Sequence, residues 1–473
     1  MQKGKVVGID QQRARLLAEY ELQRDQFFTP EWVSENTAIL VIHGIGHQQP
    51  LQTLDEFSRG LIERYQQIFP TAISFEHQLN SLDKSGSTLF QNTVRIKHAD
   101  HPMETIDIYE YYWAYCTQDK AKLSDINMWL QGVVRGAKKF YKRENEKLGS
   151  RFRDESIFFK DGKFIAWKYE FALNFISKTA ILVNALTRAI LYLLGFVPII
   201  GKVAQEFLRK YFDSFFYSLS NLLGDIVIYN VTDEKSRFFS VRKQILDGAT
   251  TALQSLLEKT ENNELAYPKV VVAGHSLGSQ IAYDAINRIN LLANSGKMKY
   301  YLEDGNFNPS KRLKNLPQKL SGQLQGFLTF GSPLDKIAFF LRQQVPKCNY
   351  IWQQVIDSYH CFKQGTWTEP FARHQRLESS SIKPILEDVK WINYYDQQDI
   401  VSGRLDYFKN LENVDCQFKT RSQFCADPAS FKHSHYWFCG DFYEDIIRNM
   451  LPNQQAVAES MDSNVGAWST SVS

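Results

Sequence analysis

A serine between two glycines stands at residues 274–278, in the sequence Gly-His-Ser-Leu-Gly. The apolar run 268–273 precedes it and apolar residues at helical spacing follow over 277–292, so we expect a strand that turns sharply into a helix. Such a turn strains the residue at its apex and makes its hydroxyl project from the sheet, where Ser276 can attack an acyl carbonyl. The N–H of Leu277, at the start of the helix, is expected to stabilise the negatively charged oxygen that forms.

The elements that position this serine alternate between apolar runs and amphipathic segments. Residues 37–42 form an apolar run that ends in glycines, and residues 50–69 carry apolar side chains at helical spacing. Further strands are expected at 105–115, 224–229, 327–331 and 389–395, and a further helix at 236–259. Continuous apolar runs are typical of strands covered on both faces. We therefore predict an α/β fold with a mostly parallel sheet flanked by helices.

One long segment interrupts this alternation. Residues 120–224 are helix-like and rich in aromatic and aliphatic side chains, and we predict that they form a helical cap inserted into the fold. The first part of the core is then 1–119 and the second is 225–452, because the strands on each side need partners from the other side to complete one sheet. The polar tail 453–473 is expected to be disordered.

The composition excludes several classes of protein. Of 473 residues 44% are hydrophobic, and 55 basic against 52 acidic side chains give a net charge of +3, which argues against disorder and against a dedicated nucleic-acid binder. Six cysteines without a CxxC pair, and no apolar leader at the start, favour a reducing cytoplasmic location. Gly44-Ile-Gly46 lacks the third glycine of a dinucleotide-binding loop, so no cofactor is predicted.

Five segments together resemble the α/β-hydrolase superfamily, and within it the lipase-like serine hydrolases. They are VIHGIGHQQP at 41–50, VVVAGHSLGSQIAYDA at 270–285, LTFGSPLDKI at 328–337, WINYYDQQDIVSG at 391–403 and HSHYW at 433–437. The resemblance implies the α/β-hydrolase fold and a Ser–acid–His triad met in that chain order. The order of candidate residues in this chain agrees with it.

The resemblance also places a second oxyanion donor in the glycine turn after 37–42. We choose the backbone N–H of Ile45 for this role, and we expect the His43 side chain to pack or hydrogen-bond inside the turn. A rival serine stands at 332, but Pro333 removes the backbone N–H that would follow the nucleophile. Ser332 is therefore expected to form only a turn at a strand end.

The acid and the base each have two candidates. Asp396 and Asp399 both follow the predicted strand 389–395, and Asp399 is preferred because Asp-Ile-Val resembles the acid region of the family; Asp396 is then expected to cap a loop. His433 and His435 are both available as the base, and His433 is preferred because its H-x-x-Y-W spacing resembles lipase-type sequences. A two-residue shift cannot be decided without geometry. The His-x-His pair has no third ligand nearby, so no metal is predicted.

An apolar run and a basic stretch raise the question of membrane contact. Residues 179–201 are long enough to span a bilayer, and 135–153 hold eight Lys and Arg against two Glu. A single span is disfavoured because the turn after 37–42 and Ser276 must share one site. We expect a cap helix, either packed on the sheet alone or also in peripheral contact with an anionic membrane through 135–202.

The predicted function is hydrolysis of a carboxylic ester, with a lipid or another lipophilic acyl ester as the substrate, through an acyl-enzyme on Ser276. Thioester hydrolysis and acyl transfer would use the same residues. The alternative from a different class is a non-catalytic hydrolase-like scaffold bound peripherally to membranes. That role has no need for a nucleophile, an acid, a base and an oxyanion turn together.

Overall fold

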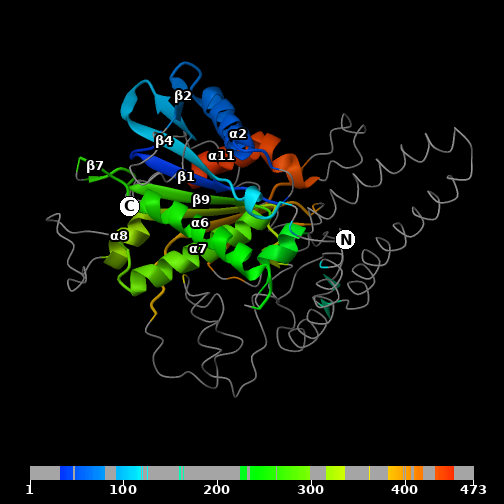
Figure 1. Cartoon of the computed structure of the whole chain (residues 1–473). Coiled ribbons are helices and arrows are strands. Elements are labelled where there is room, and N and C mark those ends of the chain that lie inside the picture. Colours follow the sequence, from blue (N-terminus) through cyan, green and yellow to red (C-terminus); the bar gives the residue numbers. More distant parts are fainter. Residues whose placement is uncertain are drawn as a thin grey trace, which may run out of the picture.

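The structure is a computed structural model of the whole chain, residues 1–473 (Figure 1). The described residues are 32–45, 48–79, 92–118, 120, 125, 159–160, 163–164, 224–231, 235–262, 264–298, 316–335, 362, 382–397, 399, 401–405, 408, 410–418 and 432–451. All statements on structure below concern these residues.

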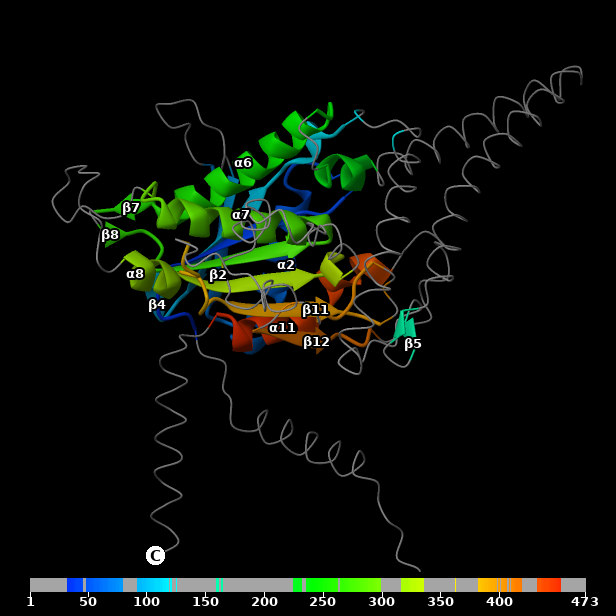
Figure 2. The ribbon, with the colours of Figure 1, turned by 90° about the horizontal axis from the view of Figure 1, so that it is seen from below.

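An eight-stranded sheet forms the centre of the molecule, in the order β12-β11-β10-β9-β1-β4-β3-β2. Neighbouring strands from β12 to β4 pair in parallel, whereas β3 and β2 pair antiparallel at one edge. Figure 2 shows β11 and β12 side by side at the other edge. The strands of this sheet are β1 (Thr37–Ile42), β2 (Ile73–Leu79), β3 (Asn92–His98), β4 (His101–Tyr111), β9 (Lys269–His275), β10 (Leu324–Phe330), β11 (Lys390–Tyr395) and β12 (Leu411–Asp415). Two short hairpins consist of β5 (Phe159–Lys160) with β6 (Lys163–Phe164) and β7 (Thr260–Glu261) with β8 (Glu264–Leu265).

Helices cover both faces of the sheet. Figure 1 shows α6 and α7 on one face and α2 with α11 on the other. The helices are α2 (Gln52–Ile68), α6 (Phe239–Leu257), α7 (Leu277–Asn294), α8 (Leu316–Gln323) and α11 (Gly440–Asn449), with the 3-10 helices η1 (Ala114–Cys116) and η4 (Lys432–Phe438). The predicted α/β fold with a mostly parallel sheet flanked by helices is therefore confirmed.

The central strands are buried along their whole length, which explains their continuous apolar sequence. Successive side chains of β1 point to opposite faces. Ala38, Leu40 and Ile42 join the core beneath α6 and α7. Ile39 and Val41 join the core beneath α2 and α11. Because apolar side chains cover both faces of β1, its sequence does not alternate between apolar and polar residues.

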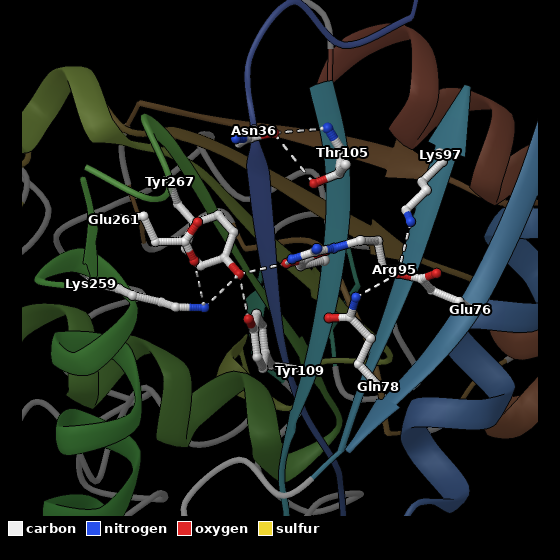
Figure 3. Close-up of polar contacts among 11 residues, drawn as sticks. Asn36, Glu76, Gln78, Arg95, Lys97, Thr105, Tyr109, Lys259, Glu261 and Tyr267 are labelled. Atoms are coloured by element: carbon white, nitrogen blue, oxygen red, sulfur yellow. Dashed lines mark hydrogen bonds and ion pairs between the residues drawn. The ribbon is translucent and has the colours of Figure 1, made fainter. Parts of the chain in front are cut away.

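A partly buried ionic cluster, centred on the fully buried Asp107, joins β3 and β4 to the segment before β9 (Figure 3). Arg95 donates from Nε and Nη2 to the two carboxylate oxygens of Asp107, at 2.7 and 2.6 Å. The hydroxyl of Tyr267 donates to Asp107 at 2.6 Å and also contacts the hydroxyl of Tyr109. Lys259 donates to the same Tyr267 hydroxyl at 3.2 Å. Because both charges of the ion pair have partners, the cluster can lie within the core.

One predicted strand is wrong. Residues 224–229 are helical, and the N–H of Asn230 donates to the carbonyl of Ile226 at 3.1 Å. A short apolar run has the same pattern in a buried strand and in a buried helical turn, so periodicity alone does not separate them.

Most of the predicted cap 120–224 lies outside the described residues, as do the apolar run 179–201 and the tail 453–473. Most of the basic region 135–202 lies outside them as well. Among the helices that the structure describes, none combines the length and the apolar character needed to cross a bilayer.

Candidate active site

Three of the predicted site residues follow the carboxyl ends of parallel strands in one sheet. Ile45 follows β1, Ser276 follows β9 and Asp399 follows β11, while His433 belongs to η4. Loops at the carboxyl ends of parallel strands meet at one edge of the sheet, where α/β proteins place their ligand sites. The topology therefore gathers segments that are far apart in the sequence.

Ser276 occupies the sharp turn between β9 and α7. Its φ of 52° and ψ of −127° lie in a region that residues other than glycine seldom adopt, so the backbone is strained here. The flanking glycines are required by close backbone contacts. A Cβ on Gly278 would lie 2.2 Å from the carbonyl oxygen of Ile42, and a Cβ on Gly274 would lie 2.6 Å from the Cα of Ser279. The two glycines therefore let the turn approach α7 and β1 more closely than a side chain would allow.

The turn after β1 is held by the buried side chain of His43. Its Nδ1–H donates to the carbonyl of Gly44 at 2.8 Å, and its Nε2 accepts the backbone N–H of Trp113 at 3.0 Å. The indole of Trp113 donates back to the His43 carbonyl at 2.9 Å and stacks on the imidazole. Burial lowers the pKa of His43 to about 4, against the opposing effect of the Gly44 carbonyl. His43 is therefore neutral, and the expectation that it hydrogen-bonds within the turn is confirmed.

This turn lies directly against the serine. A Cβ on Gly44 would lie 2.6 Å from the Cβ of Ser276, so the backbone that leads into Ile45 reaches the strained turn. Leu277 follows the serine as the first residue of α7, at the positive end of the helix dipole. The two predicted oxyanion donors therefore belong to backbone segments that adjoin Ser276.

The structure pairs Asp399 with His433. The Nδ1–H of His433 donates to Asp399 Oδ2 at 2.9 Å, and the buried carboxylate also accepts the N–H of Val401 at 2.9 Å and the hydroxyl of Tyr436 at 3.3 Å. Burial opposes ionisation of Asp399, but the hydrogen bond and charge of His433 and the Val401 N–H lower its pKa to about 2. An ionised carboxylate fixes the proton of the imidazole on Nδ1.

The other ring nitrogen of His433 is buried and has no hydrogen-bond partner in the part of the chain that the structure describes. With its proton on Nδ1, the ring has a lone pair on Nε2 that can accept a proton. The ring packs closely against Gly331, where a Cβ would lie 2.9 Å from His433 Cε1. Gly331 also has a φ of 59°, so both its conformation and its space favour glycine.

The runner-up residues have other partners. Asp396 accepts the backbone N–H of Phe418 at 2.7 Å, and its own carbonyl accepts the N–H of Asp399 at 3.0 Å. These bonds give it the loop-capping role that was expected of the second aspartate. The ring of His435 packs edge-on against Phe418, with centroids 5.8 Å apart.

The rival serine forms a local turn. Ser332 is fully buried, and its hydroxyl accepts the backbone N–H of Leu334 at 3.3 Å. This hydrogen bond joins residues on either side of Pro333, so the serine hydroxyl takes part in a local turn. The expectation of a strand-end turn at this serine is confirmed.

Two residues of the site were not identified from the sequence. Tyr436 supports the carboxylate of Asp399, and its signal was present in the H-x-x-Y-W spacing, because residues three apart share a face of a 3-10 helix. His275 was considered only as the second residue of the serine motif. Its ring lies 4.8 Å from that of His433, a contact between distant segments that no local pattern indicates.

Comparison of the chain with protein-family models, with curated proteins and with solved structures finds no match. Within the described ranges no three His, Cys, Asp or Glu side chains are grouped so that they could hold a metal ion.

Proposed function

We propose that the protein is a serine hydrolase of the α/β-hydrolase type that cleaves carboxylic esters. The observation that carries this proposal is the Asp399–His433 pair. Among the described residues Nε2 of His433 has no hydrogen-bond partner, and the His433 ring lies 4.8 Å from that of His275, the residue before the strained Ser276. A buried imidazole with one nitrogen on a carboxylate and the other free is the arrangement that a general base requires. His43, by contrast, has a hydrogen-bond partner for both ring nitrogens and no carboxylate among these partners.

In the proposed reaction, Oγ of Ser276 forms a bond to the acyl carbon while its proton passes to Nε2 of His433. The N–H groups of Leu277 and Ile45 stabilise the resulting oxyanion, and Asp399 stabilises the imidazolium. Collapse of the tetrahedral intermediate breaks the ester bond, and the departing alcohol takes the proton from His433. Water then releases the acid by the same steps.

The proposed substrate has a lipophilic acyl group. The support for this is the aromatic and aliphatic sequence of 120–224, which lies almost wholly outside the described residues. The same sequence and the basic stretch beside it support peripheral contact with an anionic membrane through 135–202. Flotation of the protein with vesicles that contain an anionic phospholipid tests this contact, with neutral vesicles as the control.

A series of p-nitrophenyl esters with acyl chains from acetate to palmitate tests the function. We expect the wild type to hydrolyse them, with kcat/KM rising along the series, and Ser276→Ala to lose more than about 10³-fold of this activity. Ser332→Ala is the matched control and should stay within about threefold of the wild type, because its hydroxyl serves only a turn. Equal activity in Ser276→Ala and the wild type would refute the proposal.

A further inference from the structure

We propose that His275 is a positioning residue, which ties the main chain of the general base His433 to the strand that carries the nucleophile. This inference rests on the proposed function, because it takes Ser276 as the nucleophile and His433 as the base.

The tie is one hydrogen bond between distant segments. The Nε2–H of His275 donates to the carbonyl oxygen of His433 at 3.1 Å, across a sequence separation of 158 residues. His275 is the last residue of β9, and Ser276 follows it directly. One peptide bond and one hydrogen bond therefore connect the nucleophile to the backbone of the base.

The rings of the two histidines are also in contact. Their centroids lie 4.8 Å apart with an interplanar angle of 32°, so His275 limits the movement of the His433 ring as well as of its backbone. Asp399 holds the same ring through Nδ1. The base is thus restrained by a carboxylate on one side and by the neighbour of the nucleophile on another.

The hydrogen bond requires one tautomer of His275. A carbonyl oxygen only accepts, so the proton must be on Nε2, and Nδ1 of His275 is buried without a partner among the described residues. Burial, reinforced by the charge of His433, lowers the pKa of His275 to about 3. His275 therefore stays neutral when His433 takes up the serine proton, and it does not compete for that proton.

Aromatic packing is the alternative explanation for this residue. His275 lies with its ring centroid 4.8 Å from that of Trp437 and 5.1 Å from that of Phe330, and a phenylalanine would preserve such contacts. Packing alone does not require the N–H, whereas positioning does. Variants that keep the ring or keep the donor separate the two roles.

The test is the second-order rate at which a fluorophosphonate labels Ser276, a reaction in which Oγ bonds to phosphorus and fluoride departs. We expect His275→Phe, which keeps the ring but not the donor, to label about 10²-fold more slowly, because small displacements of a catalytic group have effects of this size. In His275→Gln the amide nitrogen reaches about as far as Nε2, so the rate should stay within about threefold of the wild type. His275→Asn is too short to reach the carbonyl and should resemble His275→Phe.

The pH profile separates positioning from proton transfer. Because His275 does not titrate near neutral pH, the loss in His275→Phe should be the same factor from pH 6 to 9. His98→Phe is the matched control, since it removes another buried imidazole, on β3, and should leave the labelling rate unchanged.

Each remaining outcome decides the inference. A wild-type rate in His275→Phe would show that the hydrogen bond is dispensable. An equal loss in the Gln and Phe variants would show that the site requires the imidazole itself rather than its N–H donor. Either result would overturn this inference. If thermal unfolding shows that the Phe variant does not fold, the Gln and Asn variants decide the question. Absence of label in the wild type would remove the proposed function and this inference with it.

Discussion

Three histidines surround the Ser276 turn, and their neighbours give them different protonation behaviour. Burial lowers the pKa of His43 to about 4 and that of His275 to about 3, so both are neutral at physiological pH. Only His433 has a carboxylate partner among the described residues, together with an unpartnered second nitrogen. In the proposed mechanism this difference directs the serine proton to one imidazole. His43 holds the turn after β1 by its hydrogen bonds, and His275 holds the backbone of His433.

Replacement of the two candidate acids tests which one orients the base. Asp399→Asn keeps the shape but allows the wrong tautomer of His433, and we expect kcat for p-nitrophenyl esters to fall by about 10³- to 10⁴-fold. Asp396→Asn keeps an acceptor for the N–H of Phe418 and should stay within about tenfold of the wild type. A larger loss in Asp396→Asn than in Asp399→Asn would reverse the assignment.

At this scale the sequence could indicate the serine from a local pattern, whereas Asp399 was preferred over Asp396 only through a resemblance in the residues that follow it. The glycines around Ser276 are required by contacts within one strand–turn–helix unit, so a local pattern is sufficient. The pairing of Asp399 with His433 spans 34 residues and depends on how two loops meet. Both aspartates follow β11, and their local sequences do not determine which carboxylate faces the imidazole.

At the scale of single elements, α6 has a glycine where a larger residue does not fit. A Cβ on Gly248 would lie 2.2 Å from the hydroxyl oxygen of Tyr111, which is buried and donates to the Ile245 carbonyl at 2.8 Å. Alanine normally stabilises a helix by about 1 kcal/mol relative to glycine. Here we expect Gly248→Ala to lower the free energy of unfolding in urea by about 1–3 kcal/mol, as overpacking does.

Gly322→Ala in α8 is the control for this prediction, because no atom lies within 4 Å of the added Cβ. The control should be neutral or slightly stabilising. Stabilisation of the protein by Gly248→Ala would show that Tyr111 moves aside without cost.

A buried lysine links the start of β9 to the end of α11. Nζ of Lys269 donates to the carbonyl of Leu451 at 2.9 Å, and burial lowers the pKa of its ammonium group from 10.5 to about 8. Between these values the unfolded chain binds more protons than the folded one, so stability rises with pH. The wild type should therefore gain about 3 kcal/mol relative to Lys269→Met between pH 8 and 10.5.

Urea unfolding at several pH values measures this difference. Lys97→Met, which removes a more exposed lysine from β3, controls for the change in net charge. A difference between the wild type and Lys269→Met that is constant over this range would contradict the lowered pKa.

The sequence predicted the elements that are buried on both faces or that have one clearly apolar face. β1 and β9 are apolar throughout because both faces are covered, and α2 has a clear apolar stripe. Strand β2 was not predicted, because it lies at the sheet edge and most of its residues are partly or fully exposed. The helical residues 224–229 were misassigned because six apolar-rich residues are too few for a period to appear.

At the scale of the whole molecule, the cluster around Asp107 connects segments up to 160 residues apart (Figure 3). Asp107→Ala would leave the partly buried Arg95 without its partner and remove the acceptor of the Tyr267 hydroxyl. We expect the free energy of unfolding to fall by about 3–5 kcal/mol, the usual effect of breaking a buried pair. Asp55→Ala, which breaks the exposed pair with Arg59, should cost less than about 1 kcal/mol.

Equal losses in the two variants would contradict the structural role of the Asp107 cluster. The sequence predicted the α/β class of the whole molecule but not this cluster, because Arg95, Asp107 and Tyr267 lie in three separate segments. The charge pattern of one helix or strand does not predict a contact between separate segments. The contact among these three residues results from the order of the strands in the sheet.

We propose that Ser276 is a nucleophile activated by His433. Incubation with a fluorophosphonate followed by peptide mass spectrometry tests this role, with Ser276→Ala and His433→Gln alongside the wild type. We expect one adduct per wild-type chain on Ser276, none in Ser276→Ala, and labelling slowed by at least about 10³-fold in His433→Gln. An unlabelled wild type, or an adduct that persists in Ser276→Ala, would contradict it.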